Sequence, residues 1–225
     1  MERPSSTNMK EEILGAAIRL FTRKGYVNTS MDDIAEAVGL TKGGLYHYVG
    51  KKEDLLTDIH DEFFDAFFAR MSAAVESAAN PQDKLRNWVR AHATIMRDYQ
   101  GHIKVFFTEI DQLPEDTLKR MVERRDRVQG MLAEILAAGV EKGEIRGDVN
   151  LKIASFLILG MINWLYIWYR PKGKLAMEEI IDNMVKIAAG GIAAGGKQPK
   201  GDMLDGGIPG AQAPHVLDDA LDQKV

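Results

Sequence analysis

The residues best suited to chemistry lie in one short run, TKGGLYHYVGKKEDLL, at positions 41–56. Lys42 can reach a DNA phosphate or a guanine edge, and the hydroxyl of Tyr46 can donate a hydrogen bond to a phosphate. Gly43 and Gly44 each cost a helix about 1 kcal/mol relative to alanine, but they let a helix start approach a DNA backbone. The alternative is that both glycines only ease packing. The residue types therefore favour binding to DNA.

A lysine pair, Lys51 and Lys52, follows in the expected first turn of a long helix. The positive end of the helix dipole disfavours cations at this place, whereas Glu53 and Asp54 suit it. A phosphate at the helix start removes the conflict, because the dipole and both ammonium groups attract it. The alternative is a pair of solvated lysines. His47 lies on the same run, where it reads a base or rests against a phosphate.

The polar residues of this run are expected to lie on helices, because apolar residues recur at helical spacing along almost the whole chain. The first three helices are expected at about 9–24, 30–38 and 41–49. Gly39 supplies the turn between the second and the third, where a positive φ is accessible to glycine. Two short helices joined in this way form a helix-turn-helix, whose second helix enters the DNA major groove.

The run from Ile13 to Leu56 resembles the DNA-binding domain of the TetR family of bacterial regulators, with LFTRKGYVNTSMDDIAEAVGLTKGGLYHYVGKKEDLL as its core. Val49 and Gly50 depart from the pattern, since an aromatic residue often follows there. The resemblance implies an all-α homodimer that leaves palindromic double-stranded operator DNA when a small molecule binds the C-terminal domain. It also implies DNA contacts at Thr29, Ser30, Thr41, Lys42, Gly44, Tyr46, His47 and Lys52, to which the reasoning above adds Gly43 and Lys51.

The chain is expected to be all-α and to divide into three parts. Residues 9–52 form a helix-turn-helix DNA-binding domain, and residues 53–193 form a helical effector-binding and dimerisation domain. Residues 194–225 are rich in Gly, Pro and Asp, which is typical of disorder. Further helices are expected at about 51–78, 82–99, 101–112, 115–142, 150–170 and 175–193.

Two polar residues in apolar surroundings mark a candidate effector site. Arg125 falls in the apolar phase of its helix and so needs a route to solvent or an anionic partner, either in the protein or in a ligand. Asn163 shares an apolar helix face with Phe156 and Gly160, beside two tryptophans. Such residues suit a pocket for an acyl chain with a charged head group. The predicted ligand-binding residues are His92, Phe106, Arg125, Asn163, Trp164 and Trp168; for His92 the alternative is a core histidine.

The C-terminal half resembles TetR-type regulators of fatty-acid and sterol degradation, through FFTEIDQLPEDTLKRMVERRDRV, GEIRGDV and LGMINWLYIWYRPKGKL. This second resemblance implies an acyl-CoA thioester as effector and apolar C-terminal helices as the dimer surface. The alternative is another apolar effector, as in regulators of drug or aromatic-compound efflux.

Enzymes are the main rival class. The chain has no cysteine, its five histidines form no HExxH pair, and it contains no GxSxG, Walker or dinucleotide motif. We therefore expect no enzyme, no metal and no cofactor. The apolar stretch 153–169 falls short of the roughly 20 residues of a membrane span, and no signal peptide is visible. These features favour a cytoplasmic, nucleoid-associated bacterial protein without a membrane partner.

Overall fold

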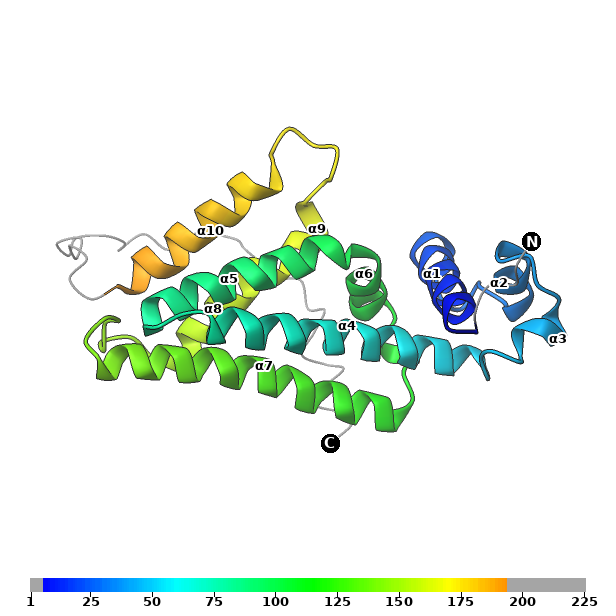
Figure 1. Ribbon diagram of the computed structural model, residues 1–225, viewed down its shortest axis with the longest axis horizontal. Coiled ribbons are helices and arrows are strands. Elements are labelled where there is room, and N and C mark those ends of the chain that lie inside the picture. The colour runs from blue at the N-terminus through cyan, green and yellow to red at the C-terminus, as the bar shows by residue number, and fades with distance from the viewer. Residues whose placement is uncertain (1–5, 194–225) are drawn as a thin grey trace, which may run out of the picture.

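The structure, a computed structural model, describes residues 6–193 and consists of helices in two groups (Figure 1). The head at one end comprises α1 (Ser6–Lys24), α2 (Met31–Ala37) and α3 (Lys42–Leu45). The body comprises α4 (Lys52–Glu76), α5 (Pro81–Asp98), α6 (Gln100–Thr108), α7 (Glu115–Glu141), α8 (Leu151–Asn163), α9 (Leu165–Trp168) and α10 (Met177–Ile192). Within the described residues no strand forms, so the all-α prediction is confirmed; the predicted disordered tail, 194–225, lies outside them.

Local chemistry sets several helix ends where the sequence predicts them. Ser30 caps α2 in a reciprocal box: its hydroxyl accepts from the Asp33 amide at 3.1 Å, and the Asp33 carboxylate accepts from the Ser30 amide at 2.7 Å. Asn80 caps α5 in front of Pro81, which occupies the first helical turn. Gly39 has a φ of +69°, so the expected left-handed turn between α2 and α3 is present.

Three of the expected helices differ in extent from the predictions. The third helix ends at Leu45 rather than near residue 49, because two of its four residues are glycines and propagate a helix poorly. The expected helix 101–112 divides into α6 and a 3-10 turn, Ile110–Gln112. The expected helix 150–170 breaks at Trp164, and the turn into α9 buries Leu165 in the core.

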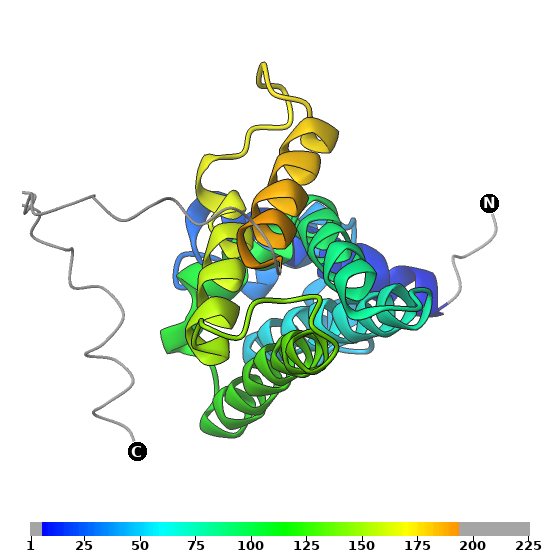
Figure 2. The same cartoon turned by 90° about the vertical axis from the view of Figure 1, so that its left-hand side faces the viewer.

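The body is organised around α5, which packs against α4, α7, α8 and α10. Trp88 at its centre is fully buried, and Leu85, Val89 and Ile95 are buried on the same helix. Figure 2, an end-on view, shows α10 lying beside α5 at one edge of the body. The core is therefore continuous from the bundle to the root of the head.

The head rests on the body through α1, which packs on α6 and α4. Gly101 in α6 allows the close approach, because a Cβ there would lie 2.6 Å from Cγ2 of Ile18. Lys104 of α6 donates a hydrogen bond to the Thr22 carbonyl at the end of α1, at 3.0 Å. A shift of α6 would therefore carry α1 with it.

Candidate functional site

The outer face of the head carries most of the predicted DNA-contacting groups. Thr41 caps α3, its hydroxyl accepting from the Gly44 amide at 3.1 Å. Lys42 is exposed and pairs with Asp32 at 3.0 Å; that hydrogen bond and charge raise the pKa of Lys42. Tyr46 is 48% exposed, and His47 lies beside it at the surface. Because an exposed ion pair is weak, Lys42 can exchange Asp32 for a phosphate.

The two glycines of α3 differ in what a side chain at each position would contact. A Cβ added to Gly44 would lie 3.2 Å from the Thr41 hydroxyl, so a side chain there would crowd the helix cap. A Cβ added to Gly43 would meet nothing within 4 Å. The packing alternative therefore accounts for Gly44 but not for Gly43, around which residues 6–193 leave open space.

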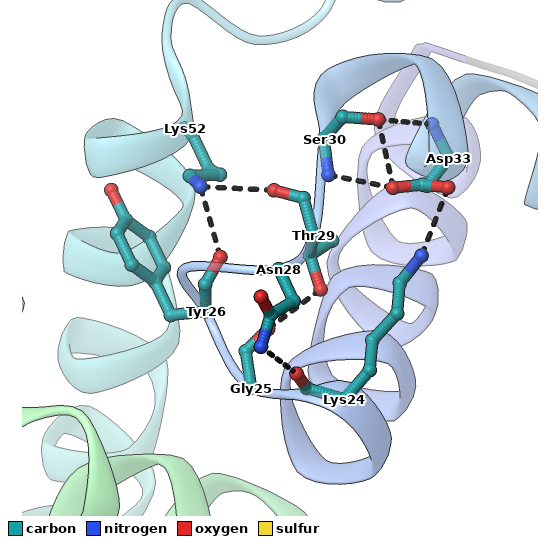
Figure 3. A network of polar contacts seen from close by, with 8 residues as sticks. All are labelled: Lys24, Gly25, Tyr26, Asn28, Thr29, Ser30, Asp33 and Lys52. Carbon is teal, nitrogen blue, oxygen red and sulfur yellow. Dashed lines mark hydrogen bonds and ion pairs between the residues drawn. The ribbon is translucent and has the colours of Figure 1, made fainter.

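The ammonium of Lys52, a predicted DNA contact, has partners within the chain (Figure 3). Its Nζ donates to the carbonyls of Tyr26 and Thr29, both at 2.9 Å, and lies 4.2 Å from the centre of the Tyr26 ring. The Thr29 hydroxyl is also turned inward and donates to the Gly25 carbonyl at 2.8 Å. Lys52 thus holds the loop between α1 and α2 against α4, and Lys51 is the more exposed member of the pair.

The body encloses a cavity of about 780 Å³ between α4, α5, α6, α7 and α8. Most of its wall is aromatic or aliphatic, with three phenylalanines of α4 facing two of α6. This volume lies within the range of small-molecule sites, which are mostly apolar with a few placed polar groups. The lining residues are Phe63, Phe64, Phe67, His92, Met96, Ile103, Phe106, Phe107, Arg125, Asp126, Val128, Gln129, Lys152, Phe156, Leu159, Gly160 and Asn163.

The charged residues of the cavity wall lie on α7 and in the first turn of α8. Arg125 and Lys152 are both exposed, and Arg125 pairs weakly with its neighbour Asp126 at 3.4 Å. The apolar phase noted in the sequence therefore places Arg125 at the rim of the cavity, where its charge remains in water. Two cations against one carboxylate leave this rim with an affinity for anions.

An uncharged polar pair interrupts the aromatic wall on α5 and α8. The His92 ring is buried edge-on against Phe67 and Trp88, each at 4.9 Å between ring centres. Burial lowers the pKa of His92 to about 3, and a hydrogen bond with Asn163 opposes this effect in part. Nδ1 of His92 has no hydrogen-bond partner among residues 6–193. His92 is therefore a neutral imidazole near pH 7.

Four of the six predicted ligand-binding residues line this cavity: His92, Phe106, Arg125 and Asn163. Trp164 and Trp168 do not; they are 59% and 40% exposed on the outer surface beyond the end of α8. Sequence reasoning missed the phenylalanines of α4, which fit a packed core equally well, and it missed Lys152. The recurrence of polar or small residues on one face of α8, at positions 152, 160 and 163, is the pattern that could have revealed it.

Apolar side chains also gather on the outside of the C-terminal helices. Helix α10 leaves Ile187 64% exposed, and α8 leaves Leu157 70% exposed. The stretch Leu151–Trp168 is apolar and long enough for a membrane span by composition alone, yet only 28% of it is buried within the chain. Large exposed apolar patches on a folded domain mark contact surfaces. The exposed residues on this surface are Ile153, Phe156, Leu157, Trp164, Ile167, Trp168 and Ile187.

Sequence comparisons match both parts of the chain to known regulators. Residues 13–59 match bacterial regulatory proteins of the tetR family, and residues 78–192 match the tetracyclin repressor-like C-terminal domain. The transcriptional repressor KstR2 of Mycobacterium tuberculosis is 28% identical, over 82% of this chain and 93% of its own. The fatty acid metabolism regulator protein of Bacillus subtilis is 23% identical, over 80% of this chain and 94% of its own.

Solved structures give the same result. AibR, solved in complex with isovaleryl coenzyme A and operator DNA, is 33% identical, with a TM-score of 0.72, over 80% of this chain and 97% of its own. The structure of the ketosteroid transcriptional regulator KstR2 of Mycobacterium tuberculosis has a TM-score of 0.76 at 26% identity, over 82% of this chain and 94% of its own. These similar proteins are transcriptional regulators.

Proposed function

Since this chain belongs to the TetR family of bacterial transcriptional regulators, we propose that it is a homodimeric repressor of a palindromic operator, released by an acyl-CoA thioester. The observation that carries the effector class is the cavity: an aromatic interior of about 780 Å³ beneath a cationic rim. An acyl chain suits the interior, and the phosphates of coenzyme A suit Arg125 and Lys152. The isovaleryl coenzyme A complex of AibR supports this chemistry.

The head, residues 9–52, is the DNA-binding part of this proposal. Helix α3 enters the major groove, with Lys42 and Tyr46 facing phosphates or base edges and Gly43 against the backbone. Ser30, Thr41, His47 and Lys51 complete the contact surface, while Thr29 and Lys52 support the loop behind it.

The body, residues 53–193, holds the effector and joins two copies. A two-fold contact through α8 and α10 would cover the exposed apolar surface described above. It would also present two α3 helices to successive major grooves, about 34–36 Å apart. This arrangement accounts for an apolar α8 without a membrane, which is consistent with the cytoplasmic regulator proposed here.

Release of the operator follows from the two contacts of α6, which lines the cavity and also packs against α1. Ile103, Phe106 and Phe107 face the cavity, whereas Gly101 and Lys104 of the same helix hold α1. A chain bound among the phenylalanines displaces α6, and α1 moves with it because the contact at Gly101 leaves no space. The two heads then lose the separation that the operator requires.

Gel shifts test the proposal, with an operator selected from random duplexes by the purified dimer. We expect acyl-CoA thioesters to release the DNA, and Lys152→Met together with Arg125→Met to raise the concentration needed. Lys119→Met, which changes an exposed lysine of α7 outside the cavity, is the matched control. Release by free aromatic compounds and not by any thioester would replace the acyl-CoA effector with the efflux-type alternative.

A further inference from the structure

The polar pair His92–Asn163 lies at a place where folding alone gives no reason for it. Both side chains line the cavity. Its walls on α4 and α6 consist of phenylalanine and isoleucine side chains. Burying an imidazole with an unpartnered nitrogen costs stability, and a phenylalanine of similar shape would avoid this cost. Asn163 retains hydrogen-bonding capacity, because an amide can make four hydrogen bonds and its contact with His92 uses one.

The cavity has different chemistry at the two ends of α8. Lys152 is in the first turn of this helix and Asn163 is its last residue. An α-helix rises 1.5 Å per residue, so their backbones are about 16 Å apart along the axis. Between them Phe156 and Gly160 line the cavity, and a Cβ at Gly160 would meet nothing within 4 Å. The wall along α8 therefore runs from cationic, through apolar and open, to polar and uncharged.

We propose that the effector carries an uncharged oxygen, a carbonyl or hydroxyl, at the far end of its apolar part, and that His92 and Asn163 select for it. This inference rests on the proposed acyl-CoA function and narrows it: the acyl group is oxygenated at its distal end. The thioester and its nucleotide lie toward the opposite end of α8, beside Lys152.

The charge state of His92 determines which end of the effector can lie beside it. A neutral imidazole cannot balance a carboxylate, so an anionic group is poorly placed at that end. Among the charged lining residues within 6–193, which are Arg125, Asp126 and Lys152, Lys152 lies at the other end of α8 from Asn163. An uncharged oxygen can accept from the Asn163 amide or share a hydrogen bond with the imidazole.

Calorimetric titration of the full-length protein tests the inference without DNA. The probes are saturated straight-chain acyl-CoA thioesters of several lengths, each paired with its ω-hydroxy and ω-oxo counterpart. At the best-fitting length we expect the oxygenated thioester to bind roughly 2- to 12-fold more tightly, the range of one net hydrogen bond. His92→Phe and Asn163→Leu should each abolish this preference.

His60→Phe is the matched control. His60 is equally buried and contacts Phe106, with ring centres 5.0 Å apart, but it does not line the cavity. This variant should keep the preference for the oxygenated probe. Because Asn163 is only half-buried, its leucine variant keeps the test valid if His92→Phe fails to fold.

Each outcome decides between the two proposals. Equal binding of plain and oxygenated thioesters at every length refutes the distal-oxygen inference and leaves the acyl-CoA repressor standing. A preference that survives both His92→Phe and Asn163→Leu also refutes it, because another group then reads the oxygen. If no thioester of either kind binds, the acyl-CoA proposal and the inference resting on it fall together.

Discussion

The buried histidines predict a specific acid sensitivity of folding. Burial lowers the pKa of His60 to about 4 and that of His92 to about 3, against about 6.5 in an unfolded chain. Around His60, Asp61 opposes the shift, while Arg124 and His102 reinforce it. Between these pKa values the unfolded chain binds more protons than the folded chain. Stability from both sites is therefore complete above about pH 6.5 and is lost as the pH falls.

The size of the effect follows from the two pKa values. At about pH 5, proton uptake by the unfolded chain costs about 2 kcal/mol for each histidine relative to pH 7.5, or about 4 kcal/mol for both. For a domain of this length, that corresponds to a fall in melting temperature of roughly 8–16 °C. His102 is shifted in the same direction by burial, with Glu62 opposing, so it adds to the loss.

Urea unfolding of wild type and of His60→Phe, His92→Phe and the double variant measures the effect. Protein concentration is held fixed, because the stability of the proposed dimer depends on it. Each phenylalanine should remove about 2 kcal/mol of the difference between pH 7.5 and pH 5 and preserve the ring contacts. His47→Gln, which removes an exposed imidazole, is the control. A double variant with the wild-type pH difference would refute the assignment of neutral buried imidazoles.

Three further predictions concern single residues. Lys52→Met should destabilise the head by about 1.5–3 kcal/mol, because two loop carbonyls lose a charged hydrogen-bond donor. Lys51→Met is the control and should leave the melting temperature unchanged. Thermal unfolding of both variants and the wild type measures the difference. Gly43→Ala should raise the melting temperature slightly, because alanine favours a helix over glycine, yet weaken operator binding in gel shifts. Gly39→Ala should instead cost about 1–2 kcal/mol through its positive φ. Equal operator affinity for Gly43→Ala and wild type would contradict the assignment of Gly43. Gly160→Leu should fill the cavity and reduce acyl-CoA binding in calorimetry without changing operator affinity, and undiminished binding would place the ligand elsewhere.

The sequence alone was enough to predict the all-α class and the helix-turn-helix of the head. Helical periodicity, the capping box at Ser30 and the glycine at position 39 act within a few residues, so their consequences are local and readable. The same locality explains why exposed positions in and just after α3, such as Lys42 and Tyr46, could be assigned to the outer face. Arg125 and Asn163 were also visible, because a polar residue in an apolar phase breaks a periodic pattern.

Only the tertiary structure decided what those patterns face. The phenylalanines of α4 have one spacing whether they fill a core or line a cavity, and the difference depends on how far α8 lies from them. The sequence did not reveal the contacts of Lys52 with the carbonyls of Tyr26 and Thr29, because both lie more than twenty positions away. The break after Asn163 turned both tryptophans out of the cavity. Periodicity fixes which side of a helix is apolar, whereas the packing of distant helices fixes what that side contacts.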